Sequence, residues 1–242
     1  MDAKPLYQSE SESTTAQTAY RNIIKWLRIQ AERTAKTVAY SSILLACVAM
    51  IEVTIAMILL SFSPSPAPII VGLITFAVYT NDRVADADAD AVSNPQQAAF
   101  ARRHGDSLYT LAAMAYGLAI SLAVFGGPIA LAITLLPGAF WVIYGSHWVT
   151  SLNSRVQRLK SVLVINSAVV ALAWATSLTF LPVAFADEPV TPAVGLVFAY
   201  FFLRSFVDVE IPNVRDIDAD RAVGVMTIPT VFGVRRTRHA LY

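Results

Sequence analysis

The chain has 242 residues, of which 56% are hydrophobic and only 14% charged, and its mean hydropathy is +0.56. This composition excludes an ordinary soluble domain, and a net charge of +1 gives no global field that would attract nucleic acid. The single cysteine, Cys47, excludes an internal disulfide, and the three scattered histidines have no metal-ligand spacing.

The N-terminal region precedes the first membrane segment. Residues 1–19 are polar and rich in Ser, Thr and Glu, so we expect a disordered tail there. Residues 20–37 place apolar side chains at helical spacing among Arg and Lys, which is typical of an amphipathic helix at the membrane interface. The remainder, residues 38–242, is the predicted membrane domain.

Six apolar segments follow, each close to the length that crosses a bilayer. Turn-forming prolines and glycines separate several of them. We therefore expect an all-α membrane protein, a multi-pass transmembrane helical bundle. Glu52, midway along the first segment, is a functional candidate by its position, but we expect a protonated, hydrogen-bonded packing residue. The six segments are about 38–62, 67–80, 108–125, 128–144, 162–185 and 190–207.

The distribution of basic residues predicts how the bundle is oriented. Successive connections between the apolar segments are expected to lie on alternate sides of the membrane. If the residues after Phe202 are counted with the C-terminal end, one side carries all 18 Lys and Arg residues and the other carries none. Cytoplasmic connections are enriched in Lys and Arg. We therefore expect a multi-pass protein of the cell membrane with both termini in the cytoplasm.

Four aspartates follow the second apolar segment directly, within residues 81–90. Because a helical residue turns by about 100°, Asp82, Asp86 and Asp90 share one face, whereas Asp88 lies off it. Carboxylates about 6 Å apart repel by roughly 3 kcal/mol at an effective dielectric constant near 20, so a cation is expected beside them. The second segment is short, and we expect its helix to continue to Asp90, with Asn94-Pro95 ending it.

A second acidic face follows the sixth segment. Asp216 and Asp220 are four residues apart, and Asn213 lies on the same side, whereas Asp218 points away. Both faces fall on the predicted cytoplasmic side. If they meet in space, they form a cluster of hard oxygen ligands that suits Mg²⁺ together with phosphate oxygens. This suggests diphosphate chemistry.

Two other interpretations apply to the first acidic run. The Ala-Asp alternation could be a solvated loop of low complexity, although recurrence of the pattern at a second place weakens that reading. A calcium EF-hand fails, because the position that requires Gly is Ala91 and the position of the bidentate Glu is Gln97.

The two acidic stretches together resemble the UbiA superfamily of intramembrane prenyltransferases. The second stretch is the more specific, since the spacing Arg-Asp-Ile-x-x-Asp-x-x-x-Gly-x-x-Thr from Arg215 to Thr227 is similar to the menaquinone-type and archaeal branches. The resemblance covers roughly residues 34–233. It implies Mg²⁺ as the cofactor, prenyl diphosphate as the donor and an apolar acceptor within the lipid bilayer.

The resemblance also implies roles for individual residues. The catalytic and metal-binding aspartates would be Asp86, Asp90, Asp216 and Asp220. Asp82 takes the position where the family usually has Asn, so it is implied as a ligand of metal and diphosphate, with Asn81 as the alternative through a shift of one residue. A basic residue before the first span would be Arg28 or Arg33. The basic residues of the implied diphosphate-binding set have an alternative role, which is to anchor the chain on the cytoplasmic side. The other implied diphosphate-binding residues are Asn213, Arg215, Arg158, Lys160, Arg102 and Arg103.

The number of spans departs from the family pattern. Members generally have nine, three of them after the second motif, whereas about six are predicted here and the chain stops at Tyr242. Three explanations stay open: a chain truncated at its C-terminus, a shortened protein that completes its bundle as a homo-oligomer, or a protein that is no longer a competent enzyme.

The predicted function is Mg²⁺-dependent transfer of a prenyl group to a hydrophobic acceptor, for which a quinone precursor, a glycerol ether lipid and a carotenoid all remain open. Aromatic π faces could stabilise an allylic cation. A CDP-alcohol phosphotransferase is one alternative, although its Asp-Gly-x-x-Ala-Arg opening is absent. A divalent-cation carrier or binding protein is another, although carriers place acidic ligands near the bilayer midplane. The candidate aromatic residues are Tyr79, Tyr144, Tyr200 and Phe201.

Overall fold

The computed structural model describes residues 6–88, 90–142, 165–215, 217–218, 221 and 226–241, which form helices and turns without a strand. The chain divides into two units, residues 1–40 and residues 41–242. In the first unit, one helix, α1, runs from Leu6 to Tyr40. The region expected to be a disordered tail is thus helical from Leu6. No Gly or Pro interrupts residues 6–40, and Pro5 directly precedes the helix, which favours this conformation.

The predicted amphipathic segment lies within α1. Its side chains are exposed, including the apolar Ile23, Trp26 and Leu27. Arg28 donates to Glu32 one helical turn later at 3.1 Å, and the Arg28 side chain is 81% exposed. A role at the membrane interface stays a prediction for this segment.

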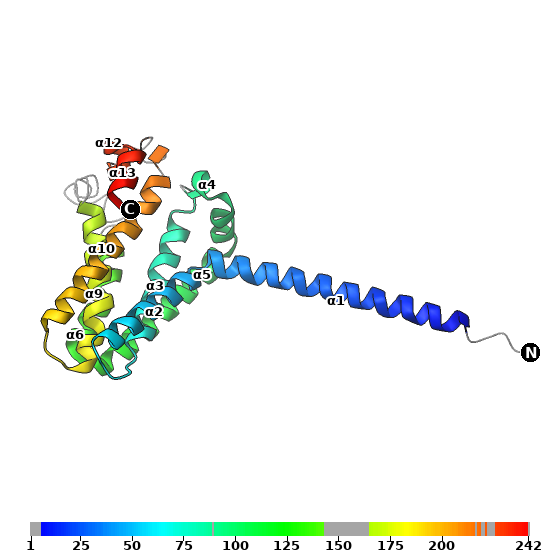
Figure 1. Cartoon of the computed structure of the whole chain (residues 1–242), viewed down its shortest axis with the longest axis horizontal. Helices are drawn as coiled ribbons and strands as arrows, with labels where there is room; N and C mark the ends of the chain where they lie inside the picture. Colours follow the sequence, from blue (N-terminus) through cyan, green and yellow to red (C-terminus); the bar gives the residue numbers. More distant parts are fainter. Residues whose placement is uncertain are drawn as a thin grey trace, which may run out of the picture. The chain divides into compact units, whose positions relative to one another are not determined.

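Among the described residues of the second unit there are six longer helices, and each overlaps one of the six predicted apolar segments, with ends that differ by up to 13 residues. In Figure 1 they alternate in direction, so that the connections near Ser63, Gly126 and Asp187 lie at one end of the unit. The helices are α2 (Ile43–Leu59), α3 (Ala67–Ala85), α5 (Pro95–Ala123), α6 (Gly127–Phe140), α9 (Ile165–Ala186) and α10 (Pro192–Arg215).

Shorter elements occupy the opposite end. Helix α4 (Asp90–Ser93) follows the C-terminal end of α3, and α12 (Ile228–Phe232) and α13 (Val234–Leu241) follow the C-terminal end of α10. Figure 1 shows that these two helix ends lie at the same end of the unit. The described parts of both acidic motifs therefore share one end, as the alternating connections predict.

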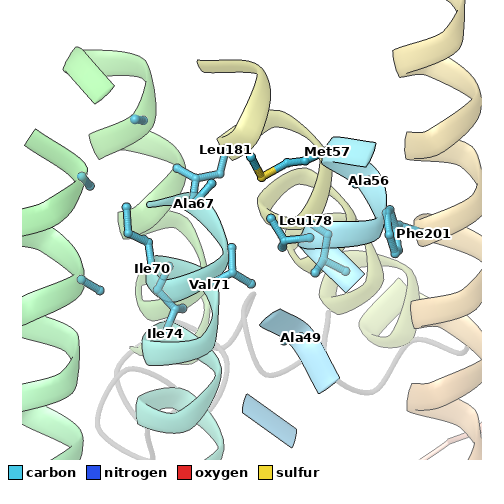
Figure 2. Packing of buried hydrophobic residues seen from close by; sticks show 14 of the residues in the cluster. Ala49, Ala56, Met57, Ala67, Ile70, Val71, Ile74, Leu178, Leu181 and Phe201 are labelled. Carbon is cyan, nitrogen blue, oxygen red and sulfur yellow. The ribbon is translucent and has the colours of Figure 1, made fainter. Parts of the chain in front are cut away.

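The core of the second unit is made of small and branched side chains. Alanines of α2 and α3 pack with Ile70, Val71 and Ile74 of α3, with Leu178 and Leu181 of α9, and with Phe201 of α10 (Figure 2). Small residues at helix contacts let the helices approach closely, which is typical of membrane bundles. Large apolar side chains are instead exposed on the outside, as a lipid-facing surface requires; examples are Ile51, Ile58, Met114, Leu118, Leu196 and Leu203.

Length and hydropathy identify candidate membrane spans among the described residues. Two stretches qualify, residues 95–140 and 167–186, and a third is counted if 20–40 and 43–59 are taken together. The all-α membrane bundle is confirmed, whereas the number of crossings stays a prediction. The stretch 95–140 contains two of the predicted segments, separated by the 3-10 turn η1 (Val124–Gly126).

The turn between α5 and α6 shows why glycine occupies it. A Cβ atom on Gly126 would lie 2.7 Å from the Ala130 side chain and 2.8 Å from the ring of Phe185. Gly127, the first residue of α6, has a φ of 80°, a conformation that L side chains rarely adopt, and Pro128 follows in the first turn of the helix. The two glycines thus permit a reversal that is packed against α9.

A polar contact joins the first residues of the second unit to the end of α3. The buried Thr80 hydroxyl donates to the carbonyl of Ser41 at 3.3 Å. Ser42, the N-cap of α2, has a φ of 65°, in the left-handed region. The start of α2 is therefore tied to the residue that directly precedes the first acidic motif.

One prediction about the helices is wrong. Helix α3 ends at Ala85 and does not continue to Asp90, because closely spaced aspartates are poor helix formers and repel one another. Arg204, counted among the 18 basic residues, lies inside α10, and the orientation inferred from those residues stays a prediction. The turn at Asn94-Pro95 is confirmed, since α4 ends at Ser93 and α5 begins at Pro95.

Candidate functional site

The first acidic motif lies where α3 gives way to α4. Asp82 is in the last turn of α3, Asp86 is the C-cap, and Asp90 begins α4. The amide of Asp86 donates to the carbonyl of Asp82 at 2.9 Å, and the amide of Asp90 donates to the carbonyl of Asp86 at 2.9 Å. These bonds keep the four-residue helical spacing across the turn. The three aspartates thus remain linked although the helix is interrupted.

Arg83 is a member of this site that sequence reasoning missed. It follows Asp82 on α3 and is half-buried. Burial lowers the pKa of its guanidinium, and the charges of Asp90 and Asp82 oppose that shift. The cation expected beside the carboxylates is therefore supplied in part by the chain itself. The sequence signal for Arg83 was its position seven residues before Asp90, within the first acidic run. The sequence analysis counted Arg83 only as one of the basic residues that orient the chain.

Asp88 contacts a basic residue of the next long helix. Its side chain is 96% exposed, and it accepts a hydrogen bond from Arg102 of α5 at 3.2 Å. Its place off the acidic face stays a prediction. The structure therefore brings Arg102 to Asp88, and the neighbouring Arg103 is exposed. A role of either arginine in binding diphosphate stays a prediction.

The second acidic motif follows the end of α10. Asn213 is half-buried in the last turn and Arg215, the last residue of the helix, is exposed. Asp218 is 95% exposed and lies 4.0 Å from Arg221. The predicted site residues Asp216, Asp220, Arg158 and Lys160, and the aromatic Tyr144, lie outside the described residues. Convergence of the two motifs therefore stays a prediction.

The chemistry of the described donors suits a hard divalent cation. Within the described residues, no group of three or more His, Cys, Asp or Glu side chains has the geometry of a metal site. Asp82, Asp86 and Asp90 nevertheless supply carboxylate oxygens, the ligands that Mg²⁺ prefers. Two of the five predicted metal ligands, Asp216 and Asp220, belong to the second motif and lie outside the described residues, so the full ligand set stays a prediction.

A second polar cluster lies deeper in the bundle. A cavity of about 100 Å³ opens between α2, α3, α9 and α10. One guanidinium nitrogen of Arg204 lies 2.6 Å from Oε1 of Glu52, and the other donates to Asp208 one turn later on α10. Two aromatic rings line the same cavity: Tyr79 and Trp174 stack at 5.5 Å with an interplanar angle of 15°.

Glu52 is hydrogen-bonded within the bundle, as predicted. Its side chain is 14% exposed, and its partner is the Arg204 guanidinium at 2.6 Å. Its protonation stays a prediction. Sequence reasoning missed Arg204 and Asp208. The signal was an Arg and an Asp four residues apart near the middle of an apolar helix, where charges are usually paired or functional.

Glu210 is a further buried carboxylate of α10. It is 1% exposed, and one of its oxygens has no hydrogen-bond partner within the described residues. It lies three residues before Asn213, on the side of α10 that leads to the second motif. Sequence reasoning missed this residue as well, because its only signal was an acidic residue flanked by apolar ones.

Comparison with known proteins decides the family. The model of the UbiA prenyltransferase family matches residues 49–242, most of the chain and both acidic motifs. The chain belongs to the UbiA prenyltransferase family. Searches of curated proteins and of solved structures gave no match. The predicted superfamily is therefore confirmed, whereas its menaquinone-type or archaeal branch stays a prediction.

Membership of the UbiA family settles the coarse biochemistry. The family consists of membrane prenyltransferases that generally use divalent metal ions, with prenyl diphosphates and hydrophobic acceptors as substrates. The protein is thus a membrane protein of a transferase family.

Proposed function

We propose that the protein transfers a prenyl group from a prenyl diphosphate to a hydrophobic acceptor inside the membrane, with Mg²⁺ as the metal. The observation that carries this proposal is the chain of Asp82, Asp86 and Asp90 at the end of α3, held at four-residue spacing by backbone bonds. It lies at the same end of the bundle as the C-terminal end of α10, after which the second motif follows in the sequence (Figure 1).

The carboxylates of both motifs would hold Mg²⁺, whose charge would stabilise the leaving diphosphate. Asp86 and Asp90 would contribute from the first motif, and Asp216 and Asp220 from the second. Arg83 places a guanidinium next to the first motif, where it can donate to phosphate oxygens. Cleavage of the bond between the prenyl carbon and the diphosphate oxygen leaves an allylic cation, which the acceptor attacks before losing a proton.

The apolar bundle would protect that cation from water. Below the acidic end, the core consists of packed Ala, Ile, Val and Leu side chains of α2, α3 and α9. A water-excluded environment strengthens the electrostatic interactions within it and suppresses hydrolysis of a reactive cation. The same helices hold Tyr79 and Trp174 beside the cavity, where their π faces can stabilise positive charge. Both termini and both motifs would face the cytoplasm.

The test uses membranes that contain the full chain, labelled geranylgeranyl diphosphate and a lipid extract of the host. We expect label to enter a lipid in the presence of Mg²⁺ and not with a chelator. Asp86→Ala and Asp216→Ala should each lower the rate by at least about a hundredfold, since each removes a metal ligand. Labelling that persists in both variants would show that the acidic motifs are not the site.

Asp88→Ala is the matched control for this experiment. Asp88 lies in the same turn and carries the same charge, but its side chain is exposed and bound to Arg102. We expect labelling within about twofold of the unmodified protein, because an exposed pair contributes little. Equal losses in Asp86→Ala and Asp88→Ala would indicate a general effect of acidic charge and not a metal site.

A further inference from the structure

Helix α1 carries an apolar face that its own unit leaves uncovered. Among the described residues of the unit 1–40, α1 is the single element, so no second layer packs against it. At about 100° per residue, five large apolar side chains of residues 20–38 fall within an arc of about 100°. All of them are exposed except Val38, which is half-buried. The apolar face of α1 consists of Tyr20, Ile23, Ile24, Leu27 and Val38.

The rest of the circumference carries positive charge. Residues 20–40 contain five basic residues and one acidic residue, so this segment has a net charge of +4. The acidic residue, Glu32, accepts a hydrogen bond from Arg28 at 3.1 Å and is therefore compensated within the helix. Within the described residues, no ion pair joins the other four cations to an acidic group. These cations, which all lie off the apolar face, are Arg21, Lys25, Arg33 and Lys36.

The charges favour a position along a membrane surface over one across a membrane. Residues 20–40 are counted as a candidate span only together with residues 43–59 of α2. A Lys or Arg side chain near the bilayer centre is costly, and five of them lie between Arg21 and Lys36. A helix that lies flat at the interface instead buries its apolar side and keeps its cations at the level of the headgroups.

A lipid surface fits this helix better than a second copy of it does. Two helices that pack through apolar faces are held in register by opposite charges along the edges of their contact. In α1, one edge of the apolar face carries Arg21 and Arg28, and the other carries Gln30 and Thr37. A second copy would therefore bring the same net positive charge. A bilayer of anionic lipids brings the opposite charge together with an apolar interior.

The chain itself holds this segment close to a bilayer. Two residues, Ser41 and Ser42, separate α1 from α2. Helix α2 belongs to the membrane bundle and exposes the apolar Ile43 in its first turn. From Tyr40 to Ile43 the chain spans at most about 11 Å. Such a short connection makes docking intramolecular, which raises the effective concentration of the lipid surface.

We propose that residues 20–38 of α1 form a binding surface for anionic phospholipids of the membrane that holds the bundle. The apolar face enters the boundary between headgroups and acyl chains, and the cations of the other side lie within reach of the negative surface potential. The predicted position at the interface is thereby narrowed to a class of lipid. The binding surface involves neither acidic motif, so it is independent of the proposed prenyl transfer.

The test follows a spin label on α1 of the full chain in nanodiscs. Cys47→Ala removes the single native thiol, so that a label can be attached at Ile24→Cys, on the apolar face, or at Lys25→Cys, off it. In discs of equal parts phosphatidylcholine and phosphatidylglycerol, the label at residue 24 should collide with oxygen dissolved in the bilayer and be shielded from a water-soluble nickel complex. The label at residue 25 should show the opposite.

Two results of this measurement would overturn the proposal. If both labels collide equally with the nickel complex, the helix is free in water. If the label at residue 24 is shielded from both oxygen and nickel, and shows spin–spin broadening in discs that hold two copies, the apolar face binds a second copy instead.

The charge of the lipid provides the second comparison. In discs of phosphatidylcholine alone, the ratio of docked to free helix should fall at least about tenfold, because each basic residue near an anionic surface contributes about fivefold to binding. Added salt should lower the ratio in the mixed discs and leave it unchanged in the neutral ones. Equal docking in both kinds of disc would refute the preference for anionic lipids.

Arg21→Gln/Lys25→Gln tests the cations themselves. Removal of two charges should lower the ratio about twentyfold in the mixed discs and by less than about twofold in the neutral ones, whereas a purely structural role would lower it in both. The matched control, Arg235→Gln/Arg236→Gln on α13, removes the same charge from the other unit and should leave the ratio unchanged. Equal losses in the two double variants would mean a general effect of net charge and would contradict the proposal.

Discussion

The acidic end of the bundle and the deeper cluster of Glu52, Arg204 and Asp208 compensate their charges in different ways. At the acidic end, Asp82, Asp86 and Asp90 come from one short stretch, and Arg83 of the same stretch compensates them in part. In the deeper cluster, Glu52 of α2 meets Arg204 of α10, far apart in sequence. A repeated charge on one element is visible in a sequence, whereas a pair assembled across two elements is not.

The largest expected effect is a loss of stability when the deeper cluster loses Arg204. Arg204→Met leaves Glu52 as an unpaired carboxylate in the bundle, and we expect the free energy of unfolding to fall by about 3 kcal/mol. The double variant Glu52→Met/Arg204→Met should recover most of this loss, since apolar side chains replace a covered ion pair well. Unfolding in mixed micelles measures both. A double variant as unstable as Arg204→Met would show that packing, and not the ion pair, is responsible.

A smaller effect is expected at the acidic end, where Arg83 and a metal ion would compete for the same carboxylates. Arg83→Gln should destabilise the metal-free protein slightly and raise its apparent affinity for Mg²⁺ by about fivefold, which corresponds to about 1 kcal/mol. A titration of thermal stability with Mg²⁺ provides the measurement. Arg21→Gln on α1 removes the same charge in the other unit and should leave the titration unchanged. An unchanged affinity in Arg83→Gln would remove Arg83 from the site.

The smallest effect is expected for the exposed pair of Asp88 and Arg102. Arg102→Ala breaks a contact whose distance, 3.2 Å, is not much longer than the 2.6 Å contact of Arg204 and Glu52. We nevertheless expect no measurable change in melting temperature, because water and salt screen charges on the surface. A loss comparable to that of Arg204→Met would mean that burial does not distinguish the two pairs.

Much of the fold follows from the sequence. Six apolar segments predict six helices, because continuous apolar runs bounded by Pro and Gly have one stable form in a membrane. Their ends are less predictable. The run of aspartates after Thr80 carried a helical spacing, and the structure keeps the spacing yet ends the helix at Ala85. Repulsion between neighbouring charges and the low helix propensity of Asp outweigh the periodicity there.

The candidate site was predictable only where one element carries it. The spacing of Asp82, Asp86 and Asp90 is a local property, so sequence alone could find it. The pairing of Glu52 with Arg204 depends on how α2 packs beside α10, which no local pattern encodes. Composition alone groups Arg204 with the basic residues that follow the sixth segment, whereas its partner, Glu52, belongs to α2.

The bond between Thr80 and Ser41 gives the bundle a mechanical link. Thr80 directly precedes Asn81, and its hydroxyl binds the carbonyl of Ser41, just ahead of the left-handed Ser42 where α2 starts. A displacement of the aspartate turn, such as one caused by metal binding, would therefore be transmitted to the beginning of α2. Because Glu52 lies two to three turns further along that helix, metal binding at the acidic end and the position of the Glu52–Arg204 pair would be coupled.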